Sequence, residues 1–121
     1  MPKILIIDDD NQFRKMLYQT LEKAGYTVSE ATNGTKGIAS FEQAPADLVI
    51  TDILMPDKEG IETIMEIRRM APDIKIIAVS GGGRIGSDSY LDLARKLGAI
   101  ETFSKPIDRK KLVEVIGNVL A

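Results

Sequence analysis

Short apolar runs alternate with amphipathic segments along the whole chain, and this alternation constrains the fold more than any other feature. Five runs have the length and composition of buried strands: Lys3–Asp8, Tyr26–Ala31, Asp47–Asp52, Ile74–Ser80 and Ile100–Ser104. Strands that are apolar on both faces, each followed by a helix, form a parallel sheet that helices cover on two sides. The sequence therefore predicts a doubly wound α/β fold.

The segments after these strands have apolar residues at helical spacing. The expected faces are Phe13, Leu17, Leu21 and Ala24; Ile38 and Phe41; Ile61, Ile64, Met65 and Arg68; Tyr90, Leu91, Ala94 and Leu97; and Leu112, Val115, Ile116 and Val119. Gly25 and Gly98 are placed to end helices in the left-handed conformation, and Asp108 is placed to cap the last helix.

Length and composition are those of one globular domain. The 121 residues, 44% of them hydrophobic, are enough to form a core, and no linker or repeat divides them, so we expect a single domain over residues 1–121. Met16, Met65 and Met70 are expected to fill gaps in that core.

Charge and cysteine content indicate which kinds of partner and which cellular compartment to expect for this protein. A net charge of −2 gives no broad basic face, so we expect no direct nucleic-acid partner. The early apolar stretch Ile4–Ile7 is too short for a signal peptide or a membrane span. Because the chain also has no cysteine, we expect a cytoplasmic protein without membrane contact.

Polar side chains follow the predicted strands at their carboxyl ends. Asp8 and Asp9 follow the first strand, Asp52 ends the third, Ser80 ends the fourth, and Lys105 follows the fifth. In an open parallel sheet these ends form one edge, where α/β proteins bind their ligands. If the first and third strands are neighbours, the three acids converge.

Such a convergence has an energetic cost that a bound cation would offset. Two carboxylates about 5 Å apart repel by roughly 3 kcal/mol at an effective dielectric of about 20. Three carboxylates and one lysine leave two net negative charges, which one divalent cation neutralises. Because the chain has no His and no Cys, its ligands are oxygens, which favour Mg²⁺ over zinc.

The same edge has the chemical groups for phosphoryl transfer. A carboxylate can attack phosphorus and form an aspartyl phosphate. The transfer needs positioning and neutralisation of the phosphoryl oxygens, for which Asp52, Lys105 and Ser80 are suitable types. Any phosphohistidine in the reaction belongs to another molecule, since these 121 residues include no His.

Several sequence pieces, in this order and at these separations, resemble a known family. They are IIDD after the first strand, VITDILMP with Gly60 eight residues beyond Asp52, IIAVS at the end of the fourth strand, and FSKP at the end of the fifth. Over essentially its whole length the chain resembles a response-regulator receiver domain of two-component signalling. The resemblance implies a flavodoxin-like sheet with strand order 2-1-3-4-5.

For the metal, the resemblance implies that Asp9 and Asp52 bind Mg²⁺ directly and that Asp8 acts through a metal-bound water. It implies a further ligand in the backbone carbonyl of Leu54, for which an apolar side chain is no obstacle.

For the reaction, the resemblance implies that Asp52 accepts a phosphoryl group from a histidine kinase or a histidine phosphotransfer protein. Ser80 and Lys105 would contact the phosphoryl oxygens, with Pro106 fixing the turn after the lysine. The chain would then be a regulator rather than an enzyme with a separate substrate. It would signal to a downstream partner or output domain by remodelling the surface around the fourth helix, fifth strand and fifth helix.

Three features differ from the family pattern or affect its consequences. Thr102 occupies the position of the usual aromatic switch residue, and strand alternation points Phe103 to the opposite face. The sequence GGGRIGSDS after Ser80 makes that loop about three residues longer than we expect for the family. Leu54 and Gly82 offer no polar side chain to orient an attacking water, so we expect slow loss of the phosphoryl group.

Other interpretations remain open from the residues. The spacing Asp8-x-Asp10 resembles the nucleophile motif of haloacid-dehalogenase-type phosphatases, although Asp10 is also placed to cap a helix. A receiver-shaped binding module that is never phosphorylated would carry the same fold. The run GGGRIG at residues 81–86 formally matches a dinucleotide motif, but only one strand follows it, and a flexible loop is the simpler interpretation.

Overall fold

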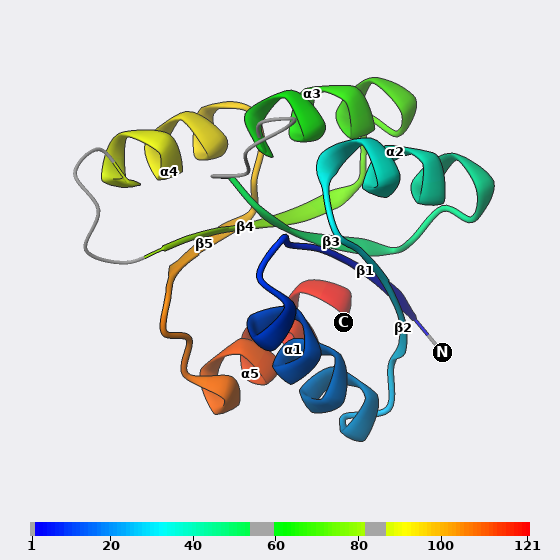
Figure 1. Ribbon diagram of the computed structural model, residues 1–121, viewed down its shortest axis with the longest axis vertical. Helices are drawn as coiled ribbons and strands as arrows, with labels where there is room; N and C mark the ends of the chain where they lie inside the picture. Colours follow the sequence, from blue (N-terminus) through cyan, green and yellow to red (C-terminus); the bar gives the residue numbers. More distant parts are fainter. Residues whose placement is uncertain (1, 54–59, 82–86) are drawn as a thin grey trace.

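The computed structural model describes residues 2–53, 60–81 and 87–121, and it contains one parallel sheet with the order β2-β1-β3-β4-β5 (Figure 1). The strands are β1 (Lys3–Ile7), β2 (Thr27–Ala31), β3 (Leu48–Asp52), β4 (Lys75–Ser80) and β5 (Glu101–Ser104). The helices are α1 (Asn11–Lys23), α2 (Gly34–Gln43), α3 (Gly60–Met70), α4 (Ser87–Lys96) and α5 (Arg109–Leu120). The doubly wound fold and the strand order are confirmed.

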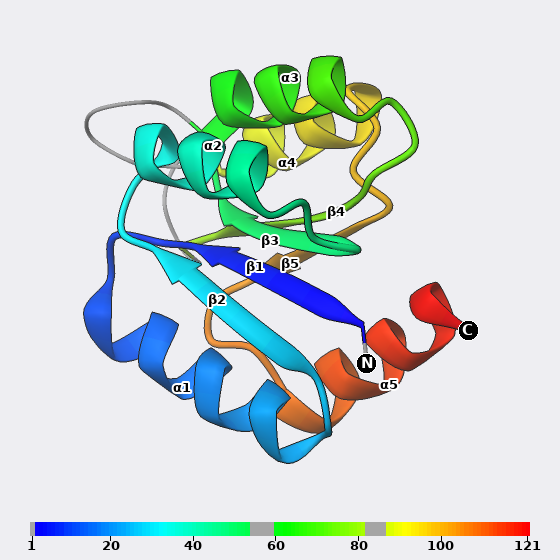
Figure 2. The same ribbon diagram turned by 90° about the vertical axis from the view of Figure 1, so that its right-hand side faces the viewer.

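Helices cover both faces of this sheet. Figures 1 and 2 show α1 and α5 on one face and α2, α3 and α4 on the other. Successive side chains of β1 point to opposite faces of the sheet and so contribute to both cores. Ile4 and Ile6 pack in the core under α1 and α5, whereas Leu5 and Ile7 pack in the core on the other face. The central strands are therefore buried on both sides, as the sequence predicts.

The predicted helix boundaries have a visible physical basis. Asp10 caps α1 by accepting from the backbone N–H groups of Gln12 and Phe13, and Asp108 caps α5 in the same way. Gly25 and Gly98, which follow α1 and α4, have φ angles of 98° and 104°, in the left-handed region that favours glycine.

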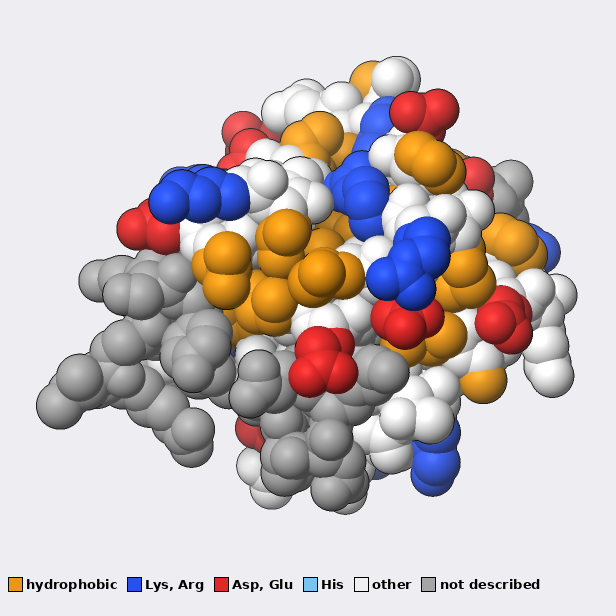
Figure 3. Space-filling model, turned by 90° about the horizontal axis from the view of Figure 1, so that it is seen from above, with side chains coloured by type: hydrophobic (Ala, Val, Ile, Leu, Met, Phe, Trp, Pro, Cys, Tyr) orange, Lys and Arg blue, Asp and Glu red, His pale blue; other side chains and the backbone are white. Residues whose placement is uncertain are grey.

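One predicted helix face is partly wrong. Met65 is 47% exposed and Met70 is 38% exposed, so neither fills a gap in the core; Met16 does pack against it. Ile67 is fully buried instead, because α3 turns Ile61, Ile64 and Ile67 toward the sheet. Figure 3 shows hydrophobic side chains on the outer surface of this helical layer.

Candidate functional site

The carboxyl end of β1 positions two of the acids differently. Asp8 is 1% exposed, whereas Asp9, the next residue, is exposed. The backbone N–H of Asp8 donates to the Ala31 carbonyl at 3.1 Å, and its Oδ1 accepts from the Asp10 N–H at 2.8 Å. The end of β2 thus holds the Asp8 backbone, and the N-cap residue Asp10 holds its carboxylate.

Arg14 holds the same loop from α1, and the sequence patterns did not single it out. Its Nη1 donates to the Asp8 carbonyl at 2.8 Å, and its Nε donates to Glu30 Oε1 at 2.7 Å. Its Nη2 donates to Asn11 Oδ1, also at 2.7 Å. The position of Arg14 near the start of a helix that begins beside the acids could have indicated a contact with their loop. One of its acceptors is the backbone oxygen of Asp8, however, and a residue pattern does not predict such an acceptor.

Asp52 ends β3 beside these residues. The register pairs Ile7 with Thr51, so the residues that follow in each strand, Asp8 and Asp52, are brought together. Oxygens of Asp8, Asp9 and Asp52 lie within 4.8 Å of one another. The sequence prediction that the three acids converge is therefore correct in its geometry.

Gly60 allows α3 to begin against the end of β3. A Cβ atom at this position would overlap the Asp52 carbonyl oxygen and the Ile53 Cα, and the Gly60 N–H donates to the Ile53 carbonyl at 3.3 Å. Only glycine fits such a close backbone approach. The glycine that follows Asp52 by eight residues thus packs directly on the backbone of the acid.

Lys105 crosses to the acids from the end of β5. Its Nζ lies 3.1 Å from Asp8 Oδ2 and 3.3 Å from Asp52 Oδ2. Its backbone N–H donates to the Ser80 carbonyl at 2.7 Å, and its peptide bond to Pro106 is cis. One ammonium group therefore contacts two of the three carboxylates.

Burial and charge set the ionisation of this group. Burial raises the pKa of Asp8 to about 6; the nearby Asp52 charge also raises it, while the Asp10 N–H and Lys105 oppose the increase. Burial alone would lower the pKa of Lys105, but the charges of Asp8 and Asp52 and the hydrogen bonds to them outweigh burial and raise it. The lysine stays protonated, and the cluster keeps an excess of negative charge.

Ser80 lies at the carboxyl end of β4 with a hydroxyl that has no bonding partner among the described residues. It is 0% exposed, and its Oγ makes no hydrogen bond with any residue in that part of the chain. A buried hydroxyl is normally hydrogen-bonded, so this one is suited to a ligand that brings its own acceptor.

The donor set fits a hard divalent cation. Three carboxylates and one ammonium leave two net negative charges, and every candidate side-chain ligand in the group is an oxygen. Asp8, Asp9 and Asp52 could therefore hold Mg²⁺ between them. Leu54, the residue expected to add a carbonyl ligand, lies outside the described residues, as do Gly82 and most of the glycine-rich segment.

Thr102, at the position where the family usually has an aromatic residue, bonds to α4. Its Oγ1 accepts from Arg95 Nη2 at 2.6 Å, and the same arginine donates to Asp92 Oδ1 at 3.0 Å. Phe103 packs into the core on the α1 and α5 face, so the two neighbours point to opposite faces, as expected. The threonine thus connects β5 to α4.

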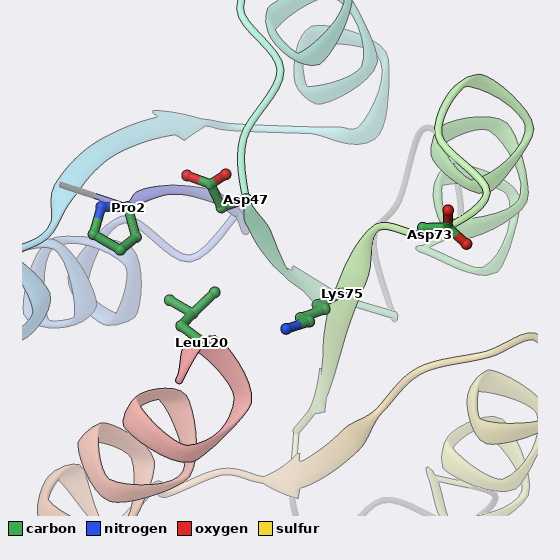
Figure 4. Close-up of a pocket in the computed structure, with 5 residues that line it drawn as sticks. All are labelled: Pro2, Asp47, Asp73, Lys75 and Leu120. Carbon is green, nitrogen blue, oxygen red and sulfur yellow. The ribbon is translucent and has the colours of Figure 1, made fainter.

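A cavity of about 540 Å³ lies at the opposite edge of the sheet and has no comparable group of acids among the described residues. Figure 4 shows its lining residues, which are Pro2, Asp47, Asp73, Lys75 and Leu120. Lys75 Nζ donates to the Val119 carbonyl at 2.5 Å, and Asp47 Oδ2 accepts from the Lys3 N–H at 2.7 Å. These polar groups already bond within the fold, and we assign this cavity no function.

Asp10 does not behave as a second acid of a phosphatase pair. Its Oδ1 accepts from the N–H groups of Gln12 and Phe13 at 3.1 Å each, which is helix capping. In this geometry the side chain is committed to α1, and nothing favours the phosphatase interpretation.

Comparisons with known proteins agree with one another. Residues 4–117 match the family described as response regulator receiver domain. The receiver protein CpdR of Brucella abortus is 34% identical over 120 residues, covering 99% of this chain and 98% of CpdR. The chemotaxis protein CheY of Thermotoga maritima is 36% identical over 118 residues, covering 97% of this chain and 96% of CheY.

Longer relatives and solved structures extend this similarity. The DNA-binding transcriptional regulator NtrC of a Bradyrhizobium strain is 34% identical over 98% of this chain, but the match covers only 24% of NtrC. A CheY-like receiver domain from Methanospirillum hungatei superposes with a TM-score of 0.91 at 31% identity, covering 99% of this chain and 94% of that one. In the described part of the chain, no helix is long and apolar enough to cross a membrane.

Proposed function

Because this chain belongs to the response regulator receiver domain family, we propose that Asp52 accepts a phosphoryl group from a partner histidine kinase or histidine phosphotransfer protein, in a Mg²⁺-dependent reaction. The observation that carries this assignment is the position of Asp52. It shares a group with two other acids, and its Oδ2 lies 3.3 Å from the Lys105 ammonium.

The reaction transfers one phosphoryl group between two molecules. A carboxylate oxygen of Asp52 attacks phosphorus and forms a P–O bond, while the P–N bond of the phosphohistidine breaks and its electron pair returns to the imidazole. The donor imidazole belongs to the partner, because the 121 residues contain no His. Mg²⁺ held by Asp8, Asp9 and Asp52 would supply positive charge to the phosphoryl oxygens.

The remaining polar groups stabilise charge on the transferred group. The Lys105 ammonium, already between Asp8 and Asp52, pairs with one phosphoryl oxygen. The buried Ser80 hydroxyl donates to another, which gives that group the bond that it lacks among the described residues. Phosphoryl transfer requires Lys105 and Ser80 only to position and stabilise the phosphoryl oxygens, not to form covalent bonds.

The regulatory part of the proposal follows from the same contacts. Residues 1–121 act as one cytoplasmic receiver domain that changes shape when Asp52 is phosphorylated and so signals to a downstream partner or output domain. Loss of the phosphoryl group is slow, as expected from Leu54 and Gly82. No feature of the described part of the site favours a receiver-shaped module that is never phosphorylated.

Intact-mass spectrometry tests the proposal. Wild type incubated with acetyl phosphate and Mg²⁺ should gain one phosphoryl group, and Asp52→Asn should gain none. Omission of Mg²⁺ should also abolish the gain. Label found on Asp8 after trapping and peptide mapping would support a phosphatase instead, and no label on wild type would support the binding-module alternative.

A further inference from the structure

The Lys105 ammonium has an aromatic neighbour in addition to its carboxylates. Its Nζ lies 4.2 Å from the centroid of the Phe13 ring, within the roughly 6 Å over which a ring face attracts a cation. Phe13 belongs to the first turn of α1, whereas Lys105 follows β5. We propose that Phe13 is a positioning residue that holds the Lys105 ammonium beside Asp52; this inference rests on the proposed function.

A lysine at this site needs more than its carboxylates to stay in place. Its ammonium is strongly hydrated and is carried on a flexible four-carbon stem. Asp8 Oδ2 at 3.1 Å and Asp52 Oδ2 at 3.3 Å attract it. A divalent cation on the same carboxylates would share their negative charge and weaken their hold on Lys105. The Phe13 ring carries no net charge, so its attraction for the ammonium persists.

The backbone of Phe13 is hydrogen-bonded to the loop that carries the acids. The Phe13 N–H donates to Asp10 Oδ1 at 3.1 Å, and the Asp10 N–H donates to Asp8 Oδ1 at 2.8 Å. The ring is partly buried against the core between the sheet, α1 and α5. The hydrogen bonds restrain the Phe13 backbone relative to Asp8, and core packing restrains the ring. A leucine there would fill much of the space without attracting a cation.

Two affinities measured by calorimetry distinguish a role of Phe13 in positioning Lys105 from a role in packing alone. The first is the affinity for Mg²⁺, and the second is the affinity for beryllofluoride, a phosphoryl mimic, at saturating Mg²⁺. For Phe13→Leu we expect beryllofluoride binding to weaken about three- to tenfold, in line with a partly exposed cation–π contact. Mg²⁺ binding should stay within about twofold, since the Phe13 side chain is not one of the carboxylates Asp8, Asp9 and Asp52 that would hold the ion.

Three further variants control for aromaticity and packing. Phe13→Tyr keeps the ring and should bind beryllofluoride nearly as wild type does. Replacement of Phe13 by 3,4,5-trifluorophenylalanine keeps the shape but withdraws charge from the ring face, so it should weaken binding as leucine does. Phe41→Leu makes the same substitution in the core on the other face of the sheet and should leave both affinities unchanged.

The possible failures are distinguishable. Wild type that binds neither Mg²⁺ nor beryllofluoride would contradict the proposed function itself. Wild-type affinity for beryllofluoride in Phe13→Leu would overturn the inference about Phe13 alone. A parallel loss of both affinities in Phe13→Leu, or wild-type affinity in the trifluoro variant, would make the ring a packing element and would also overturn it.

Discussion

The buried carboxylate of Asp8 lowers the stability of the metal-free fold, although it belongs to the candidate metal site. It is almost fully buried, and it lies in a group with Asp9 and Asp52. Burial and the Asp52 charge raise its pKa to about 6 from the ordinary 3.8, despite the contact with Lys105. The metal-free protein therefore folds with a carboxylate that would be more stable in water.

The sign of this effect predicts that Asp8→Asn stabilises the metal-free protein. Because the folded state holds the Asp8 proton more tightly, the stability of wild type falls as pH rises from about 4 to about 6. Above that window the full cost is present, about 3 kcal/mol for a shift of this size. We expect Asp8→Asn to raise the free energy of unfolding by up to this amount at pH 8 and by little at pH 4, as measured by urea denaturation.

The matched control for this prediction is Asp9→Asn. It removes a carboxylate from the same group, but one that is exposed, so its gain in metal-free stability should be smaller. If Asp8→Asn is less stable than wild type at pH 8, the buried carboxylate contributes to folding rather than opposing it.

At the residue scale, the sequence predicted some of the residues that lie together in the candidate site and not others. Asp8, Asp9, Asp52, Ser80 and Lys105 were found because each lies at the end of a strand, and topology alone brings such ends together. The contact of Phe13 with Lys105 and that of Arg14 with the Asp8 carbonyl were not predicted. Phe13 has the spacing of an ordinary core residue, and its contact with Lys105 depends on how a side chain reaches across from β5.

At the element scale, the chain's turn and cap residues made the boundaries predictable. Each strand begins and ends within one residue of its expected bounds, and Asp10 and Asp108 cap helices as expected. The error on α3 has a physical cause. Met65 and Ile67 are both apolar, and spacing alone did not establish which of them faces the sheet.

The contact between α4 and β5 gives a prediction at this scale. Arg95 Nη2 donates to Thr102 Oγ1 at 2.6 Å, so Thr102→Val removes the acceptor and keeps the side-chain shape. We expect amides at residues 92–97 to exchange faster with solvent, with a loss of global stability below about 1 kcal/mol because the bond is exposed. Hydrogen–deuterium exchange read by mass spectrometry measures this.

Thr102→Ser is the control, since it keeps a hydroxyl for Arg95. Its exchange at residues 92–97 should match that of wild type. If Thr102→Val also matches wild type, the arginine does not tie α4 to β5, and Thr102 has no role in connecting the two elements.

At the scale of the whole molecule, the two edges of the sheet differ in composition. The carboxyl edge gathers Asp8, Asp52 and Lys105 together with the Ser80 hydroxyl, which has no partner among the described residues. At the amino edge, polar groups bond within the fold; for example, Lys75 Nζ donates to the Val119 carbonyl. A ligand bound at the carboxyl edge should therefore change the structure of that edge and leave the structure of the amino edge unchanged.

We expect a phosphoryl group at Asp52 to act on the rest of the fold through β4 and β5. Ser80 and Lys105 end or follow these two strands, and the Lys105 N–H donates to the Ser80 carbonyl at 2.7 Å. Any shift of these residues toward phosphoryl oxygens therefore moves both strand ends. Through its hydrogen bond from Arg95, Thr102 on β5 is expected to pass such a shift to α4.

This arrangement predicts where a phosphoryl mimic slows amide exchange. With Mg²⁺ and beryllofluoride, protection should rise at residues 8–10, at Ser80 and Lys105, and also at residues 92–97 and 101–104, because Thr102 and Arg95 join those segments. Residues 47–48 and 75 at the amino edge serve as an internal reference and should not change.

In Thr102→Val the protection should remain at the site and disappear from residues 92–97. Protection confined to the site in wild type would mean that binding energy is not transmitted to α4, whereas uniform protection of the whole chain would mean that ligand binding stabilises the fold without selecting a second conformation.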